Sequence, residues 1–147
     1  MIQVRRILYP TDFSSYSNQA YFHAVGLAET YGASLTVVYV LTPGSPEAAR
    51  GRRYWLDQLE QVRPGNPDIA VSHVLLDGDP ANEIAAYAAD AGIDVIVIGT
   101  HGRTGVDRLV MGSVAERVMR EAPCSVLVVK LAKGAGAANR PLLVAAR

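Results

Sequence analysis

The sequence predicts an α/β domain built on a single doubly wound, five-stranded, mainly parallel sheet with helices on both faces. Short apolar segments alternate along the chain with segments whose apolar residues recur at helical spacing, and this alternation is typical of a parallel sheet. The run Val95-Ile96-Val97-Ile98 is wholly apolar and β-branched, as expected of a central strand buried on both faces. With the strands numbered along the chain, we expect the order 3-2-1-4-5 across the sheet.

The elements follow from apolar spacing and from residues that start or end helices. Ser14 or Ser15 is suited to cap the first helix, and Gly32 and Gly92 are suited to end the first and third helices. Pro80 fits the first turn of the third helix, where a missing N–H is tolerated. The predicted elements are strand 7–9, helix 14–31, strand 35–40, helix 47–62, strand 69–76, helix 81–91, strand 95–98, helix 113–121 and strand 126–129.

Length and composition are those of one globular domain. The chain has 147 residues, of which half are hydrophobic and 19% are charged, and this is enough to bury a single core. Basic and acidic residues balance at 14 each, whereas proteins that grip nucleic acid usually carry a basic excess, so we expect no nucleic-acid partner. No apolar stretch has membrane-spanning length and no signal region opens the chain, so we expect no membrane contact and a cytoplasmic location.

The last residues differ in composition from the rest of the chain. They are rich in Ala and Gly, and their charged residues, Lys133, Arg140 and Arg147, are all basic. We therefore divide the chain into a domain, residues 1–130, and a C-terminal tail, residues 131–147, which we expect to be flexible.

A glycine-rich segment, Gly99 to Ser113, lies between the most apolar strand and the last predicted helix. Glycine lets the backbone approach an anion, and the N–H groups and dipole at a helix N-terminus favour phosphate. Ser113 is suited both to cap that helix and to donate its hydroxyl. A loop of this length in a compact domain is usually functional, so we predict a nucleotide site here. The alternative is a connection whose glycines serve turns only.

Two common nucleotide motifs are missing from the sequence. It contains no Gly-x-x-x-x-Gly-Lys-Ser/Thr segment, which excludes a P-loop. No Gly-x-Gly-x-x-Gly segment follows the first predicted strand, which argues against the usual dinucleotide-binding fold. The predicted site is therefore of another kind.

The motifs resemble those of the universal stress protein (UspA-like) family. The spacing Gly99, two residues, Gly102, nine residues, Gly112-Ser113 matches the family's nucleotide-binding signature. Residues 7–14, 78–80, 94–99 and 122–129 also look like family segments, and the similarity extends from Arg5 to Lys130. Because every signature position is kept, the chain resembles the ATP-binding branch.

The resemblance implies a site for ATP, or for ADP or AMP, with Mg²⁺ accompanying the phosphates. Asp12 would hold the ribose or adenine side, with Pro10 and Thr11 shaping that wall. Val40 would contact adenine, and the ribose would lie by Ile98 and Gly99. The phosphates would be surrounded by Gly102, Gly112, Ser113 and Val114, with Arg103 as a further candidate.

Two alternatives stay open at single positions. From the residues alone, Asp12 is equally suited to cap the following helix and to contact a ligand; the resemblance favours the ligand. His101 and Arg103 either meet a phosphate or are solvated loop residues. The segment 41–68 is also shorter than is usual in the family, and in relatives this segment can lie near the pocket mouth.

The implied function is a nucleotide-binding protein of stress response or signalling, without a clear water-activating base for fast catalysis. Slow ATP hydrolysis or autophosphorylation remains an open alternative. The resemblance also implies a homodimer joined through the last strand, Val126 to Val129, as family members commonly are. A second class is a dimeric interaction module of this kind that binds no ligand. A third is a receiver-like phospho-switch with Asp77 as acceptor, but the first strand supplies one acid, Asp12, where such a site needs a pair.

Overall fold

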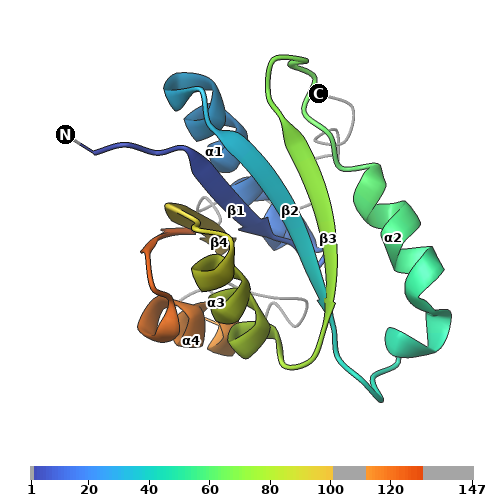
Figure 1. Cartoon of the computed structure of the whole chain (residues 1–147). Helices are drawn as coiled ribbons and strands as arrows, with labels where there is room; N and C mark the ends of the chain where they lie inside the picture. Colours follow the sequence, from blue (N-terminus) through green and yellow to red (C-terminus); the bar gives the residue numbers. More distant parts are fainter. Residues whose placement is uncertain (1, 101–111, 131–147) are drawn as a thin grey trace.

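The computed structural model describes residues 2–100 and 112–130, and the described elements alternate between strand and helix as predicted (Figure 1). A short 3₁₀ turn, Ala48–Arg50, precedes the second helix. The elements are β1 (Arg6–Pro10), α1 (Ser15–Tyr31), β2 (Ser34–Leu41), α2 (Arg52–Glu60), β3 (Val71–Asp77), α3 (Pro80–Asp90), β4 (Val95–Gly99), α4 (Ser113–Glu121) and β5 (Ser125–Val129).

Within the described ranges the five strands form one sheet with the order β3-β2-β1-β4-β5, and every neighbouring pair is parallel. The predicted fold class and strand order are therefore confirmed. β3 and β5 are the two edges. The order reverses between β1 and β4, because the chain runs outward from β1 in one direction and from β4 in the other.

Helices cover both faces of the sheet. α1 and α2 pack on one face, where Ile7 and Tyr9 of β1 are fully buried, and α3 and α4 pack on the other, where Leu8 is fully buried (Figure 1). Neighbouring β1 side chains thus enter opposite cores, as the alternation of a strand requires. Every helix in the described part of the chain is too short or too polar to cross a membrane.

Most of the predicted helix ends are correct. Ser14 caps α1, since its side chain accepts from the backbone N–H of Ser17, and Gly32 ends it with φ +65°. Pro80 occupies the first turn of α3, behind the N-cap Asp79. The predicted cap of α4 was wrong. Gly112 is its N-cap, without a side-chain hydrogen bond, and Ser113 is already the first helical residue.

The predicted helix 47–62 exists but is too long, because the chain breaks within this range and α2 covers only Arg52–Glu60. Gly51 has φ +90° and ψ 154°, a conformation that no helix contains and that glycine adopts with little strain. The 3₁₀ turn lies before this glycine and α2 begins after it.

The third strand begins later than predicted, at Val71. The residues before it are held by an Asx turn, in which the side chain of Asn66 accepts from the N–H of Asp68.

Candidate functional site

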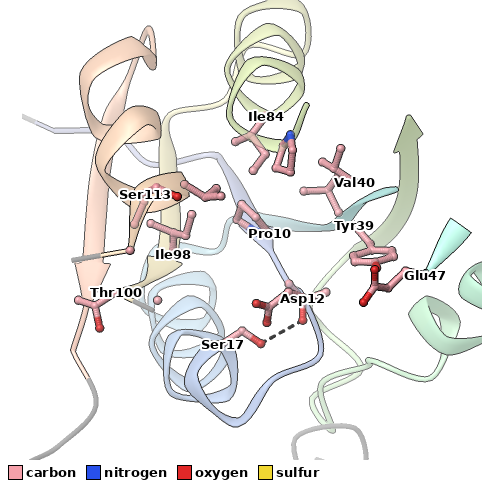
Figure 2. Close-up of a pocket in the computed structure, with 17 residues that line it drawn as sticks. Pro10, Asp12, Ser17, Tyr39, Val40, Glu47, Ile84, Ile98, Thr100 and Ser113 are labelled. Atoms are coloured by element: carbon pink, nitrogen blue, oxygen red, sulfur yellow. Dashed lines mark hydrogen bonds between the residues drawn. The ribbon is translucent and has the colours of Figure 1, made fainter. Parts of the chain in front are cut away.

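A cavity of about 320 Å³ opens at the carboxyl ends of β1 and β4 (Figure 2). This is the point at which the strand order reverses and at which open parallel sheets usually bind ligands. The volume is at the lower end of the range for small-molecule pockets, about 300–1,000 Å³. Of the eleven predicted site residues, all but Gly102 and Arg103 line this cavity. Those two, like His101, lie outside the described residues.

One wall consists of Pro10, Thr11 and Asp12, which follow the buried part of β1. The N–H of Thr11 donates to the carbonyl of Val38 at 2.9 Å, so this wall continues the pairing of β1 with β2. The hydroxyl of Thr11 accepts from the N–H of Phe13 at 2.9 Å and lies 3.1 Å from the hydroxyl of Ser17. The backbone that carries Asp12 is therefore held on both sides.

Asp12 does not cap α1, since Ser14 does. The carboxylate instead accepts from the N–H of Ser14 at 2.9 Å, which forms an Asx turn ahead of the helix. Asp12 is half-buried and lines the cavity (Figure 2). The side chain thus fixes its own loop while facing the pocket.

The opposite wall combines the end of β4, Ile98 and Gly99, with the start of α4. Here Gly112, Ser113 and Val114 line the cavity. The N–H of Gly112 donates to the carbonyl of Thr100, so the two ends of the glycine-rich segment meet at the cavity. The first helical bond joins the N–H of Glu116 to the carbonyl of Gly112, and N–H groups ahead of such a bond point out of a helix.

A third part of the lining comes from the end of β2 and from α3, which packs in the same core cluster. Val40, 8% exposed, was predicted from the sequence, and beside it lie Pro80 and Ile84 of α3. Apolar side chains from β2, β4 and α3 therefore surround one region of the cavity. This arrangement suits a flat apolar group.

Sequence reasoning missed several lining residues. The position of Tyr39 near the end of β2 could have indicated it, because the ends of parallel strands gather at one edge of a sheet. Glu47 gave no such signal, since its place depends on the break at Gly51. The remaining missed residues are Ser17, Val38, Pro80, Ile84, Thr100 and Ala115.

The charged groups are unevenly placed around the cavity. Among the described lining residues, the charged side chains are those of Asp12 and Glu47, both acidic. Figure 2 shows Ser113 across the pocket from Glu47, with Asp12 between them. The dipole of α4 presents its positive end on the Ser113 side. One side therefore favours an anion and the other favours hydrogen-bond donors.

A buried tyrosine supports the cavity wall that contains Thr11 and Ser17. Tyr9 is 1% exposed and its hydroxyl donates to the carbonyl of Ser17 at 2.8 Å. Burial raises the pKa of Tyr9 to about 12, so it stays a neutral donor at any physiological pH. His23 and His73 bond to the backbone carbonyls of Gln19 and Val62 and lie outside the lining.

Asp77, the acceptor of the phospho-switch alternative, lies elsewhere. It ends the edge strand β3 and is paired with Arg52. It does not line the cavity. Among the described residues, no group of three or more His, Cys, Asp or Glu side chains is placed to hold a metal ion. The geometry therefore gives no support to a receiver-like centre.

The fold and the cavity define a doubly wound α/β protein with a cavity at its strand switch point. Comparison with known proteins identifies the family, since the model of the Universal stress protein family matches residues 3–130. The chain belongs to the universal stress protein family. A universal stress protein of Methanocaldococcus jannaschii is 34% identical over 142 residues, which cover 88% of this chain and 84% of that protein.

Solved structures of universal stress proteins share this fold. The universal stress protein UspA of Lactobacillus plantarum has a TM-score of 0.73 at 25% identity, covering 88% of this chain and all of that one. A universal stress protein of Archaeoglobus fulgidus in complex with dAMP has a TM-score of 0.64 at 23% identity, with 88% and 100% covered. Another universal stress protein, in complex with cAMP, has a TM-score of 0.65 at 22% identity, with 89% and 100% covered.

Proposed function

We propose that the cavity binds an adenine nucleotide, ATP or its relatives ADP and AMP. The observation that carries the proposal is the pairing, across one cavity, of a helix N-terminus with a carboxylate at the end of β1. The protein would act in stress response or signalling by changing conformation or partner with its nucleotide state.

The start of α4 supports a phosphate position. Gly112 has no side chain to block the approach of an anion, and the N–H groups of residues 113–115 precede the first helical bond. Both the dipole and these donors favour phosphate at that point. Gly102 and Arg103 are proposed to complete the phosphate side. Mg²⁺ would be held largely by the phosphate oxygens themselves.

The other side of the cavity supports the nucleoside. A carboxylate accepts from hydroxyl groups, so Asp12 is suited to a ribose. Val40, Ile98 and Ile84 offer apolar surface for a flat base. The dAMP and cAMP complexes of proteins with this fold add support for an adenine ring.

We also propose a homodimer joined through β5. This strand is an edge of the sheet, and Leu127 on it is 38% exposed. An apolar edge strand is a ready surface for pairing with a second copy. The nucleotide pocket and this edge are separate surfaces, so binding and dimerisation are compatible.

Titration calorimetry with AMP, ADP and ATP, with and without Mg²⁺, tests the nucleotide proposal. The decisive variant is Gly112→Leu, which places a bulky side chain at the α4 N-terminus and should weaken binding by about tenfold or more. Gly26→Leu is the matched control, because Gly26 is exposed and has open space around it. Equal affinity of Gly112→Leu and Gly26→Leu would contradict the phosphate position. No heat with any nucleotide would favour the ligand-free dimeric module.

A further inference from the structure

The chain has a single tryptophan, and it stands directly behind the nucleoside side of the cavity. Trp55 lies on α2, is 6% exposed and does not line the cavity itself. Its ring centroid lies 4.9 Å from that of Tyr39, which does line the cavity. It also stacks on Phe13, with 5.5 Å between centroids and 28° between planes.

Phe13 is held in a backbone conformation that only its surroundings can maintain. Among the described non-glycine residues it is the one with positive φ, at +64°. A left-handed conformation is unfavourable for a bulky side chain, so it persists only where neighbouring contacts determine it. Those contacts are the bond to the Thr11 hydroxyl and the rings of Tyr39, at 5.1 Å, and Trp55. Since Asp12 precedes Phe13, the same contacts fix the direction of its carboxylate.

Trp55 also holds the second acidic residue of the cavity. Its indole N–H donates to the backbone carbonyl of Glu47 at 2.7 Å. Glu47 lies in the connection between β2 and α2, and Gly51 turns the chain there with φ +90°. The indole therefore fastens this connection to the same aromatic cluster that shapes the Asp12 turn.

We propose that Trp55 is a positioning residue for the nucleoside side of the site. It holds Asp12, Tyr39 and Glu47 together as one wall of the cavity. Binding of a ligand in the cavity therefore changes the surroundings of the Trp55 ring. The inference rests on the proposed function. It adds that α2, a helix outside the cavity, governs the affinity for the ribose and base while the start of α4 receives the phosphate.

Variants of Trp55 and a matched core residue test the inference by calorimetry with AMP. Trp55→Leu removes the ring contacts and the donor, and should weaken AMP binding by about tenfold, whereas Trp55→Phe removes the donor but keeps an aromatic ring and should weaken it by about threefold. The control is Leu59→Ala, on the same helix and fully buried in the same core. Measured at a temperature where circular dichroism shows each variant folded, the control should keep wild-type affinity within about twofold.

The intrinsic fluorescence of the wild-type protein provides a second readout, because all indole emission comes from Trp55. Titration with AMP should change the Trp55 emission until it reaches a plateau. The midpoint of this change should equal the midpoint measured by calorimetry. Wild-type affinity in both Trp55 variants, or an unchanged emission at saturating AMP, would overturn the inference. If Trp55→Leu fails to fold, Trp55→Phe and the emission still decide it. No heat with the wild type would overturn the proposed function itself, and the inference with it.

Discussion

Arg117 on α4 donates to the side-chain oxygen of Asn82 on α3 at 2.7 Å, and it pairs at 3.0 Å with Asp79, the N-cap of α3. The contact joins the middle of α4 to the N-terminal end of α3. The N-terminal ends of both helices line the cavity, through Pro80 on one side and Ser113 on the other. The spacing between the starts of α3 and α4, at the proposed base and phosphate positions, is therefore held by this contact as well as by the sheet.

Substitution Arg117→Gln should loosen the joint between α3 and α4. Because the side chains of Arg117 and Asp79 are 37% and 45% exposed, the contribution of the pair to stability is small, and we expect a loss below about 1 kcal/mol. The affinity for AMP should fall by about threefold, since α4 no longer presents its first turn in one place. Calorimetry measures the affinity and urea unfolding measures the stability.

The control for that prediction is Arg120→Gln, which removes the same charge from the same helix. Arg120 is exposed and pairs weakly with Glu116, at 3.8 Å. An equal loss of AMP affinity in both variants would show a general charge effect, and would contradict a role for the contact with α3.

Substitution Asp12→Asn should separate the two tasks of this side chain. Asparagine still accepts from the N–H of Ser14 and supports the same turn, so the thermal midpoint without ligand should hardly change. The lost charge weakens a bond to a ribose hydroxyl, and AMP affinity should fall by about tenfold. Unchanged affinity would mean that Asp12 serves the turn alone.

Asp94 should make the fold sensitive to acid. Its carboxylate accepts from the N–H groups of Arg5 and Arg6 at 2.8 and 2.9 Å. These two bonds, ahead of the neighbouring arginine charges, lower its pKa from the ordinary 3.8. A lowered folded pKa stabilises the fold above the unfolded value, and this contribution is lost as the pH falls through the folded pKa.

Urea unfolding of the wild type and Asp94→Asn, at about pH 7 and at about pH 3, measures this effect. The variant should be less stable at the higher pH, with a smaller difference between the two proteins at the lower one. Asp68→Asn, at an exposed turn position, is the control. If the free energy of unfolding falls by the same amount in the wild type and in Asp94→Asn on acidification, Asp94 is excluded as a cause.

Substitution Leu127→Arg should disrupt the proposed dimer without affecting the pocket. A charge on the apolar edge strand opposes pairing with a second copy. Sedimentation should show a shift from dimer to monomer, with AMP affinity preserved. Phe22→Arg is the matched control, because Phe22 is equally exposed, at 38%, but lies on α1. A wild type that sediments as a monomer would contradict the dimer proposal directly.

The sequence predicted the sheet and the place of the site because both follow from patterns within short segments. The apolar run of β4 indicated a central strand, and Ile98 and Gly99 at its end do line the cavity. Pro10 and Val40 were found for the same reason, since the ends of parallel strands share one edge of a sheet. Their predicted contacts with a nucleotide remain predictions.

What the sequence did not predict depends on contacts between distant residues. The helical spacing over 47–62 was real, but the conformation of Gly51 interrupts the helix and brings Glu47 to the cavity. The positive φ of Phe13 requires Tyr39 and Trp55, which lie far along the chain. No pattern within a short segment predicts this aromatic cluster, because its members come together only when the sheet forms.

The bond between Gly112 and Thr100 has a consequence for how this site can diverge among relatives. It closes the backbone directly across the base of the glycine-rich segment, and Thr100 is in turn anchored to the carbonyl of Val129 on β5 at 3.0 Å. The start of α4 is thus tied to the sheet through backbone groups, whose bonds do not depend on which side chains the segment carries. Relatives can therefore exchange side chains in the glycine-rich segment while the helix that we propose as the anion site keeps this attachment.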